Sequence, residues 1–255
     1  MSRPRLDLVA APDGARDLVL LAHGGQEHSM RDPHDWRAPL LRMWPFAAAA
    51  RDAVPYAAVG LIRYRYRGWN GVHAHAAADL RVVLDGLPQQ YARVALIGHS
   101  MGARAVLRSG DHERVAGVLG LAPWVDRSDS LVELPDRVAV LAHGDADRIT
   151  SPKSTGHYAR QLREAGCRVA HLTVAGEAHS LLRRHGDWDE LVRRFVRLTF
   201  APDGSAGELA ALLSEDPARP ADALPRWSAA TGTTRGVLAV ARARRAVPVL
   251  RARVA

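Results

Sequence analysis

The stretch RVALIGHSMGARAVLRSG, residues 93–110, limits the possible folds of this chain more than any other. Four apolar residues run into Gly98, His99 and Ser100 stand at a sharp corner, and small residues resume from Gly102. A G-x-S-x-G pattern between a strand and a helix holds its serine on a strained turn, with Oγ exposed at the carboxyl end of a sheet. The pattern therefore predicts a nucleophilic Ser100 at the edge of an α/β sheet.

The rest of the first 200 residues agrees with such a sheet. Strand-like apolar runs alternate with helix-like segments, which predicts a parallel sheet with helices on both faces. The segment 36–53 is predicted as a helix with Pro45 inside it, and the apolar runs lie at 6–10, 17–23, 57–66, 114–123, 137–144 and 168–174.

A serine needs a base to become a nucleophile, and the base needs an acid to orient it. Two carboxylates, Asp145 and Asp147, directly follow the strand at 137–144. The turn favours Asp147 as the acid over the sheet edge and leaves Asp145 as a turn residue, while Asp126, after another strand, is a less favoured alternative. His179 lies in the loop after the last strand and is the predicted base.

The stretch LLAHGGQ, residues 20–26, supplies the remaining part of the site: another strand ends at His23, and Gly24 and Gly25 follow it. Two successive glycines let the backbone pass close to a bound carbonyl. The N–H groups of Gly25 and Met101 are therefore the predicted oxyanion donors, the second of them at a helix N-terminus. His23 is predicted to brace the loop.

These motifs together resemble the α/β-hydrolase superfamily. The resemblance covers residues 6–200 and rests on His23-Gly24-Gly25, Ser100, Asp147 and His179 in chain order. It implies a mostly parallel central sheet of about seven strands with helices on both faces. The change of composition after Phe200 separately predicts a C-terminal extension over 201–255, partly helical or disordered. The resemblance also implies hydrolysis of esters, thioesters, amides or peptides, or acyl transfer.

One departure from related lipases concerns the lid. Only residues 124–136 separate two of the central strands, fewer than the ~50 residues of an independently folded unit, so no cap domain is predicted. Loops must then wall a short and partly open acyl pocket. Trp36, Trp69 and Trp124 lie on such loops and are the predicted substrate contacts, although ordinary packing is the more frequent role of each.

Charge and composition exclude several other functions. The net charge is +8, but residues 231–255 hold six arginines and no acid, which leaves +2 for the rest of the chain. The body is therefore not predicted to bind nucleic acid, and the basic end is predicted as a mobile tail in preference to a docking element.

Cys167 is the single cysteine, and His73 and His75 have no third ligand nearby, so no metal site is predicted. No apolar run is long enough to span a membrane, and no secretory leader is evident, so a cytoplasmic location is expected.

The sequence thus predicts a cofactor-free serine hydrolase that cleaves a small carboxylic ester or thioester through an acyl-enzyme on Ser100. Two alternatives remain open. One is an acyltransferase that uses the same triad, and the other is a non-catalytic ligand-binding protein of the same fold.

Overall fold

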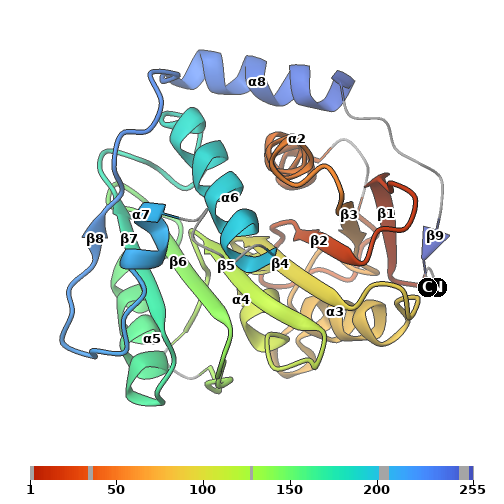
Figure 1. The fold of residues 1–255 in the computed structure, drawn as a ribbon, viewed down its shortest axis with the longest axis horizontal. Coiled ribbons are helices and arrows are strands. Elements are labelled where there is room, and N and C mark those ends of the chain that lie inside the picture. The colour runs from red at the N-terminus through yellow and green to blue at the C-terminus, as the bar shows by residue number, and fades with distance from the viewer. Residues whose placement is uncertain (1–2, 34–36, 127–128, 201–206, 247–252, 255) are drawn as a thin grey trace.

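The computed structural model describes residues 3–33, 37–126, 129–200, 207–246 and 253–254. Within them, nine strands form one sheet in the order β8-β7-β6-β5-β4-β2-β3-β1-β9 (Figure 1). The strands are β1 (Arg5–Ala10), β2 (Asp17–Ala22), β3 (Ala58–Arg63), β4 (Arg93–His99), β5 (Val115–Leu121), β6 (Val138–Gly144), β7 (Val169–Val174), β8 (Asp222–Ala223) and β9 (Arg253–Val254).

Most of the sheet is parallel, as predicted. Strands β2 to β8 run parallel to one another, whereas β1 pairs antiparallel with β3 and with β9. The count exceeds the expected seven because two short strands from after residue 200 extend the two edges.

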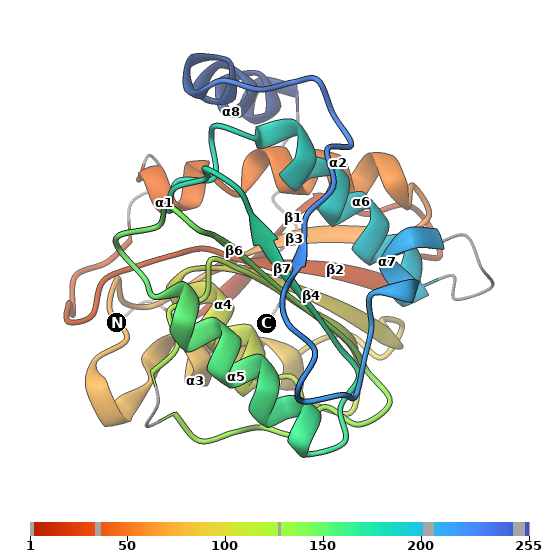
Figure 2. The same ribbon diagram turned by 90° about the vertical axis from the view of Figure 1, so that its left-hand side faces the viewer.

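Helices cover both faces of the sheet (Figure 2). On one face lie α3 (His75–Asp85), α4 (Met101–Arg108) and α5 (Pro152–Glu164), and on the other lie α2 (Trp44–Ala53) and α6 (His185–Phe200). The central strands are buried on both faces, which explains their continuous apolar runs. None of the described helices combines the length and apolar composition needed to cross a bilayer.

The predicted helix over 36–53 is two helices in the described part of the chain, α1 (Ala38–Leu41) and α2. Pro45 lies in the first turn of α2, where its missing N–H costs nothing. In a continuous helix its ring would clash with the carbonyl four residues earlier. The break therefore leaves Arg42 at the end of α1.

No cap domain separates β5 from β6. Of the residues between these strands, 122–126 and 129–137 are described, and they contain no helix or strand. The prediction of a sheet without a cap domain is therefore confirmed for the described residues.

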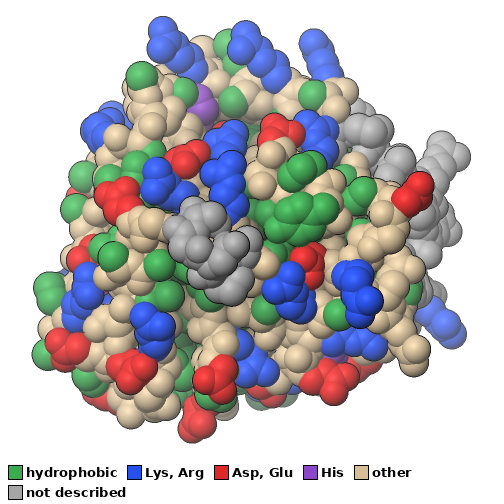
Figure 3. Space-filling view, viewed as in Figure 1, with side chains coloured by type: hydrophobic (Ala, Val, Ile, Leu, Met, Phe, Trp, Pro, Cys, Tyr) green, Lys and Arg blue, Asp and Glu red, His purple; other side chains and the backbone are tan. Residues whose placement is uncertain are grey.

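The C-terminal segment differs from the predicted mobile tail. After α7 (Gly207–Ala211) and β8, helix α8 (Thr233–Ala246) lies across α2 and α6 (Figure 1). Gly236 packs so closely on the backbone of Leu182 that a Cβ there would lie 2.3 Å from its carbonyl oxygen. Arg244 stacks on Trp44 at 4.5 Å. Figure 3 shows basic side chains projecting along the upper edge of the molecule, over α8. The sequence favoured a mobile tail because the composition changes after Phe200 and chain termini are often poorly ordered.

Candidate active site

Ser100 lies in the corner between β4 and α4, with φ 57° and ψ −118°. A residue with a side chain rarely adopts this conformation, so the surrounding structure must impose it. Neither glycine of the motif tolerates a Cβ atom. At Gly98 a Cβ would lie 2.3 Å from the carbonyl oxygen of Gly102, and at Gly102 it would lie 2.1 Å from that of Ala22. The two glycines thus allow the strand, turn and helix to approach closely enough to form the corner.

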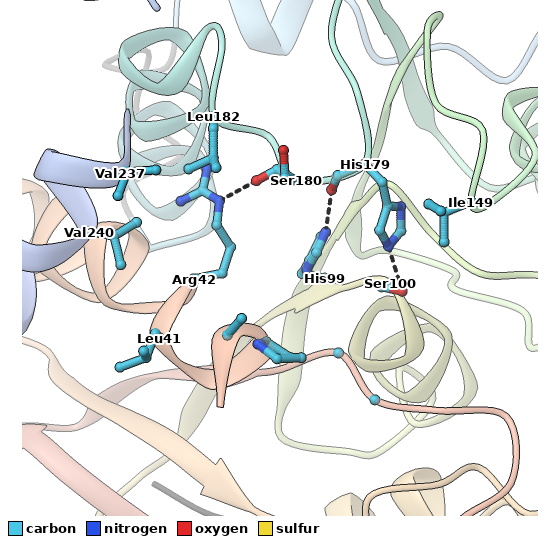
Figure 4. Close-up of a pocket in the computed structure, with 14 residues that line it drawn as sticks. Leu41, Arg42, His99, Ser100, Ile149, His179, Ser180, Leu182, Val237 and Val240 are labelled. Atoms are coloured by element: carbon cyan, nitrogen blue, oxygen red, sulfur yellow. Dashed lines mark hydrogen bonds between the residues drawn. The ribbon is translucent and has the colours of Figure 1, made fainter. Parts of the chain in front are cut away.

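The structure brings together the three residues predicted as a triad. His179, in the loop between β7 and α6, places Nε2 3.0 Å from Ser100 Oγ (Figure 4). Its other ring nitrogen, Nδ1, lies 2.8 Å from Asp147 Oδ2. This is the geometry in which a carboxylate orients an imidazole that can take the serine proton.

Asp147 lies after β6 and its side chain is fully buried. Burial alone would raise the pKa of this carboxyl, but hydrogen bonds from His143 and His179 and from the N–H groups of Ile149 and Thr150 outweigh it. They hold the pKa of Asp147 well below its usual range. The carboxylate is therefore ionised wherever it has to orient His179.

The alternative acids occupy other positions. Asp145 Oδ1 accepts the N–H of Gly176 at 2.6 Å and so fixes a turn between two strand ends. The N–H of Asp126 bonds to Asp129, and both residues border a separate hollow. The contact of His179 Nδ1 with a carboxylate is with Asp147.

Two further histidines brace the site in their neutral forms. Burial, together with the neighbouring His179, lowers the pKa of His99 to about 3, so its ring is neutral. Its Nε2–H donates to the carbonyl of His179 at 2.9 Å. Burial lowers the pKa of His23 to about 4, and its Nδ1 lies 2.7 Å from the carbonyl oxygen of Gly24. His23 thus contacts the backbone of its own loop, which is the loop that the sequence predicted it to brace.

The two predicted oxyanion donors come from two separate segments of the chain, the loop after β2 and the start of α4. Met101 is the first residue of α4, and Gly25 borders the same pocket as Ser100. A Cβ at Gly25 would lie 2.3 Å from the carbonyl oxygen of Arg67 and 2.5 Å from Met101 Sδ. Glycine is therefore needed for this loop to pass so close to the start of α4.

A pocket of about 450 Å³ opens beside Ser100 and His179. Its walls are mainly apolar. They come from α1, the loop after His179 and α8, with Gly24, Gly25 and Ile149 from two further loops (Figure 4). Apolar wall residues are Ala38, Pro39, Leu41, Ile149, Leu182, Val237 and Val240. This volume and lining are typical of a site for a small organic molecule.

Two of the three predicted tryptophan contacts, Trp69 and Trp124, do not line this pocket. Trp69 and Trp124 border a second hollow and make an edge-to-face contact with ring centres 6.3 Å apart. The guanidinium of Arg104 lies 4.4 Å from the first ring and 4.7 Å from the second. Trp36 lies outside the described residues.

Several residues of the site carry no recognisable sequence signal. Thr150 Oγ1 contacts Asp147 Oδ2 at 3.0 Å and His179 Nδ1 at 3.1 Å, and His143 contacts the same carboxylate oxygen at 3.0 Å. The sequence of α8 shows an apolar pattern, but it does not indicate that this helix lies over the pocket. No cluster of three or more metal-ligating side chains occurs in the described part of the chain.

Comparison with known proteins shows which fold this chain shares with solved structures. No family model and no curated protein matches the chain. Among solved structures, esterase PE8 superposes with a TM-score of 0.59 at 17% identity, over 78% of this chain and 100% of that one. XC6422 of Xanthomonas campestris, a serine hydrolase without a lid, gives 0.53 at 20% identity, over 76% and 87%. A carboxylesterase of Bacillus cereus gives 0.54 at 18% identity, over 73% and 93%.

Proposed function

This chain has the α/β-hydrolase fold, and we propose that it is a serine hydrolase that cleaves small carboxylic esters or thioesters. The observation that carries the proposal is the chain of contacts from Ser100 through His179 to a buried, ionised Asp147. A purely structural role would not require a strained serine at the mouth of an apolar pocket. The names of the similar structures, two of which are esterases, favour the same reaction class.

The first half of the reaction forms an acyl-enzyme. Ser100 Oγ attacks the acyl carbon while His179 Nε2 accepts its proton, and Asp147 stabilises the imidazolium that results. The carbonyl oxygen becomes an oxyanion, which the N–H groups of Gly25 and Met101 stabilise. When the C–O or C–S bond breaks, His179 returns the proton to the leaving group.

The second half releases the acid. Water enters as the alcohol or thiol leaves, and His179 accepts one of its protons as it attacks the acyl carbon. The tetrahedral intermediate then collapses, and the proton on His179 passes to Ser100 Oγ. An alcohol or amine in place of water would make the same residues an acyltransferase, which is the second reaction open to this site.

The acyl group occupies the apolar pocket in this proposal. The pocket wall is formed in part by Val237 and Val240 of α8 and by residues of α1. The sequence analysis had assigned this role to loops that carry tryptophans. Each methylene buried there contributes about 0.8 kcal/mol to binding, so kcat/KM rises with acyl length and levels off where the chain leaves the wall.

The experiment that tests the proposed function combines two measurements on the unmodified protein. We expect turnover of p-nitrophenyl acetate or butyrate and stoichiometric labelling by a fluorophosphonate, found by mass spectrometry on the peptide that contains Ser100. A protein that binds an apolar ligand but shows neither turnover nor labelling would be the non-catalytic relative instead.

The wall formed by α8 gives a prediction about acyl length. Val240→Trp places a large ring in the pocket, so we expect kcat/KM for p-nitrophenyl hexanoate to fall at least ~10-fold relative to acetate, the loss of two or more buried methylenes. The matched control is Leu238→Trp on the same helix, whose side chain is 51% exposed and does not border the pocket. Equal chain-length profiles for the two variants would show that the acyl chain lies elsewhere.

A further inference from the structure

Arg42 carries its charge into the interior beside the pocket. Its side chain is 6% exposed, and burial lowers its pKa to about 10, so it remains charged at neutral pH. The carboxylates of Asp189 and Glu177 raise its pKa through space and so offset part of this effect. No ion pair, however, joins Arg42 to a carboxylate of the described residues. A buried charge without a paired charge is costly, so the groups that it contacts are of interest.

Its contacts are directed at one short segment of backbone. Arg42 Nε donates to the carbonyl of Ser180 at 2.7 Å, and Nη2 donates to the carbonyl of Leu181. The guanidinium also stacks on Phe46 at 4.4 Å, while Nη1 has no hydrogen-bond partner. Both accepting residues directly follow His179, so the guanidinium bonds to the backbone that carries the proposed base (Figure 4).

The loop that carries His179 needs such support. It has little regular structure, and Leu181 has φ 57°, which is unfavourable for a residue with a bulky side chain. Its amide groups converge on the buried carboxylate of Glu177, which accepts the N–H of Arg184 at 2.6 Å and the indole N–H of Trp188 at 3.1 Å. Glu177 therefore binds donors at the end of the loop, and Arg42 binds the carbonyls immediately after His179.

The interruption between α1 and α2 places Arg42 where it can make these contacts. Arg42 directly follows α1 as its C-cap residue, and Pro45 prevents the helix from continuing through it. An apolar residue of similar length would fill the same space without burying a charge. The position of this charge is therefore better explained by the loop that it holds than by the stability of the core.

We propose that Arg42 is a positioning residue, which holds the loop after His179 so that the imidazole stays within hydrogen-bond distance of Ser100. The inference rests on the proposed hydrolase function. It assigns Arg42 no contact with the reacting atoms. A displacement of the base by about 1 Å lowers the rate by up to ~100-fold, and this sets the scale of the expected effect.

The test compares two buried arginines that both donate to backbone carbonyls. In Arg42→Met we expect kcat for p-nitrophenyl acetate to fall ~10- to 100-fold, with KM changed less than about threefold and a parallel loss of fluorophosphonate labelling rate. The control is Arg163→Met. Arg163 is 3% exposed and donates to the carbonyls of Val169 and Arg219, away from the pocket. We expect its kcat to stay within about twofold.

A second measurement separates positioning from a structural role. In Arg42→Ala, millimolar guanidinium chloride is expected to restore kcat in a saturable manner, because the free ion can donate to the same two carbonyls, whereas sodium chloride is not. Three outcomes would overturn the proposal: unchanged kcat in Arg42→Met, no rescue of Arg42→Ala, or an Arg42→Met protein that fails to fold while Arg163→Met folds. Each is distinct from failure of the proposed function, in which the unmodified protein itself lacks turnover and labelling.

Discussion

Ser100→Ala is expected to lower kcat for p-nitrophenyl esters by at least ~10³-fold, because the members of a catalytic triad act as a unit. The substitution removes an Oγ whose hydrogen bond in the structure is to His179 Nε2. It should therefore leave the fold intact, with a circular dichroism spectrum and melting temperature close to those of the unmodified protein. Fluorophosphonate labelling should disappear as well.

The control for this variant is Ser109→Ala. Ser109 is also buried, at the other end of α4, and does not border the pocket. We expect it to keep both turnover and labelling. If the Ser100→Ala protein remained active, or if the label moved to a nearby serine without loss of rate, Ser100 would not be the nucleophile.

The parts of the site that could be predicted from the sequence are those placed by the ends of strands. Parallel strands deliver their carboxyl ends to one edge of a sheet, so the residues that follow β4, β6 and β7 meet there. Ser100, Asp147 and His179 come together for this reason. The elbow was the easiest to recognise, since its glycines are required by contacts with adjacent backbone.

The walls of the pocket could not be predicted in the same way. They depend on how separate segments pack, and a single sequence carries no record of that packing. Trp69 and Trp124 were expected near the substrate, but Arg104 stacks on both rings beside a different hollow. Val240, in a segment that carries several arginines, borders the pocket because α8 crosses α2 and α6.

The supporting residues were also hidden from the sequence. Arg42 contacts carbonyls 138 and 139 residues later in the chain, and no local pattern indicates such a pairing. Thr150 follows Asp147 by three residues, yet its contacts depend on the fold of the turn between them. These residues share one property: each acts through backbone or side chains that only tertiary structure brings near.

Asp147→Asn is expected to lower kcat by ~10³- to 10⁴-fold, the largest effect of any substitution outside Ser100 and His179. The buried carboxylate accepts hydrogen bonds from two imidazoles and two backbone N–H groups. An amide has one oxygen in place of two and presents N–H groups where His143 and His179 now donate, so it favours the wrong tautomer of His179. It also cannot stabilise the imidazolium formed during attack.

Asp145→Asn is the matched control, two residues away in the same turn. Its Oδ1 accepts the N–H of Gly176, which the side-chain carbonyl of asparagine can also accept, so we expect kcat within about threefold of the unmodified protein. Both variants should be measured by ester turnover and by the rate of fluorophosphonate labelling. If Asp145→Asn were crippled and Asp147→Asn active, the roles of the two carboxylates would be exchanged. If both were active, His179 would depend on an acid other than these two, and Asp126 would be the next residue to substitute.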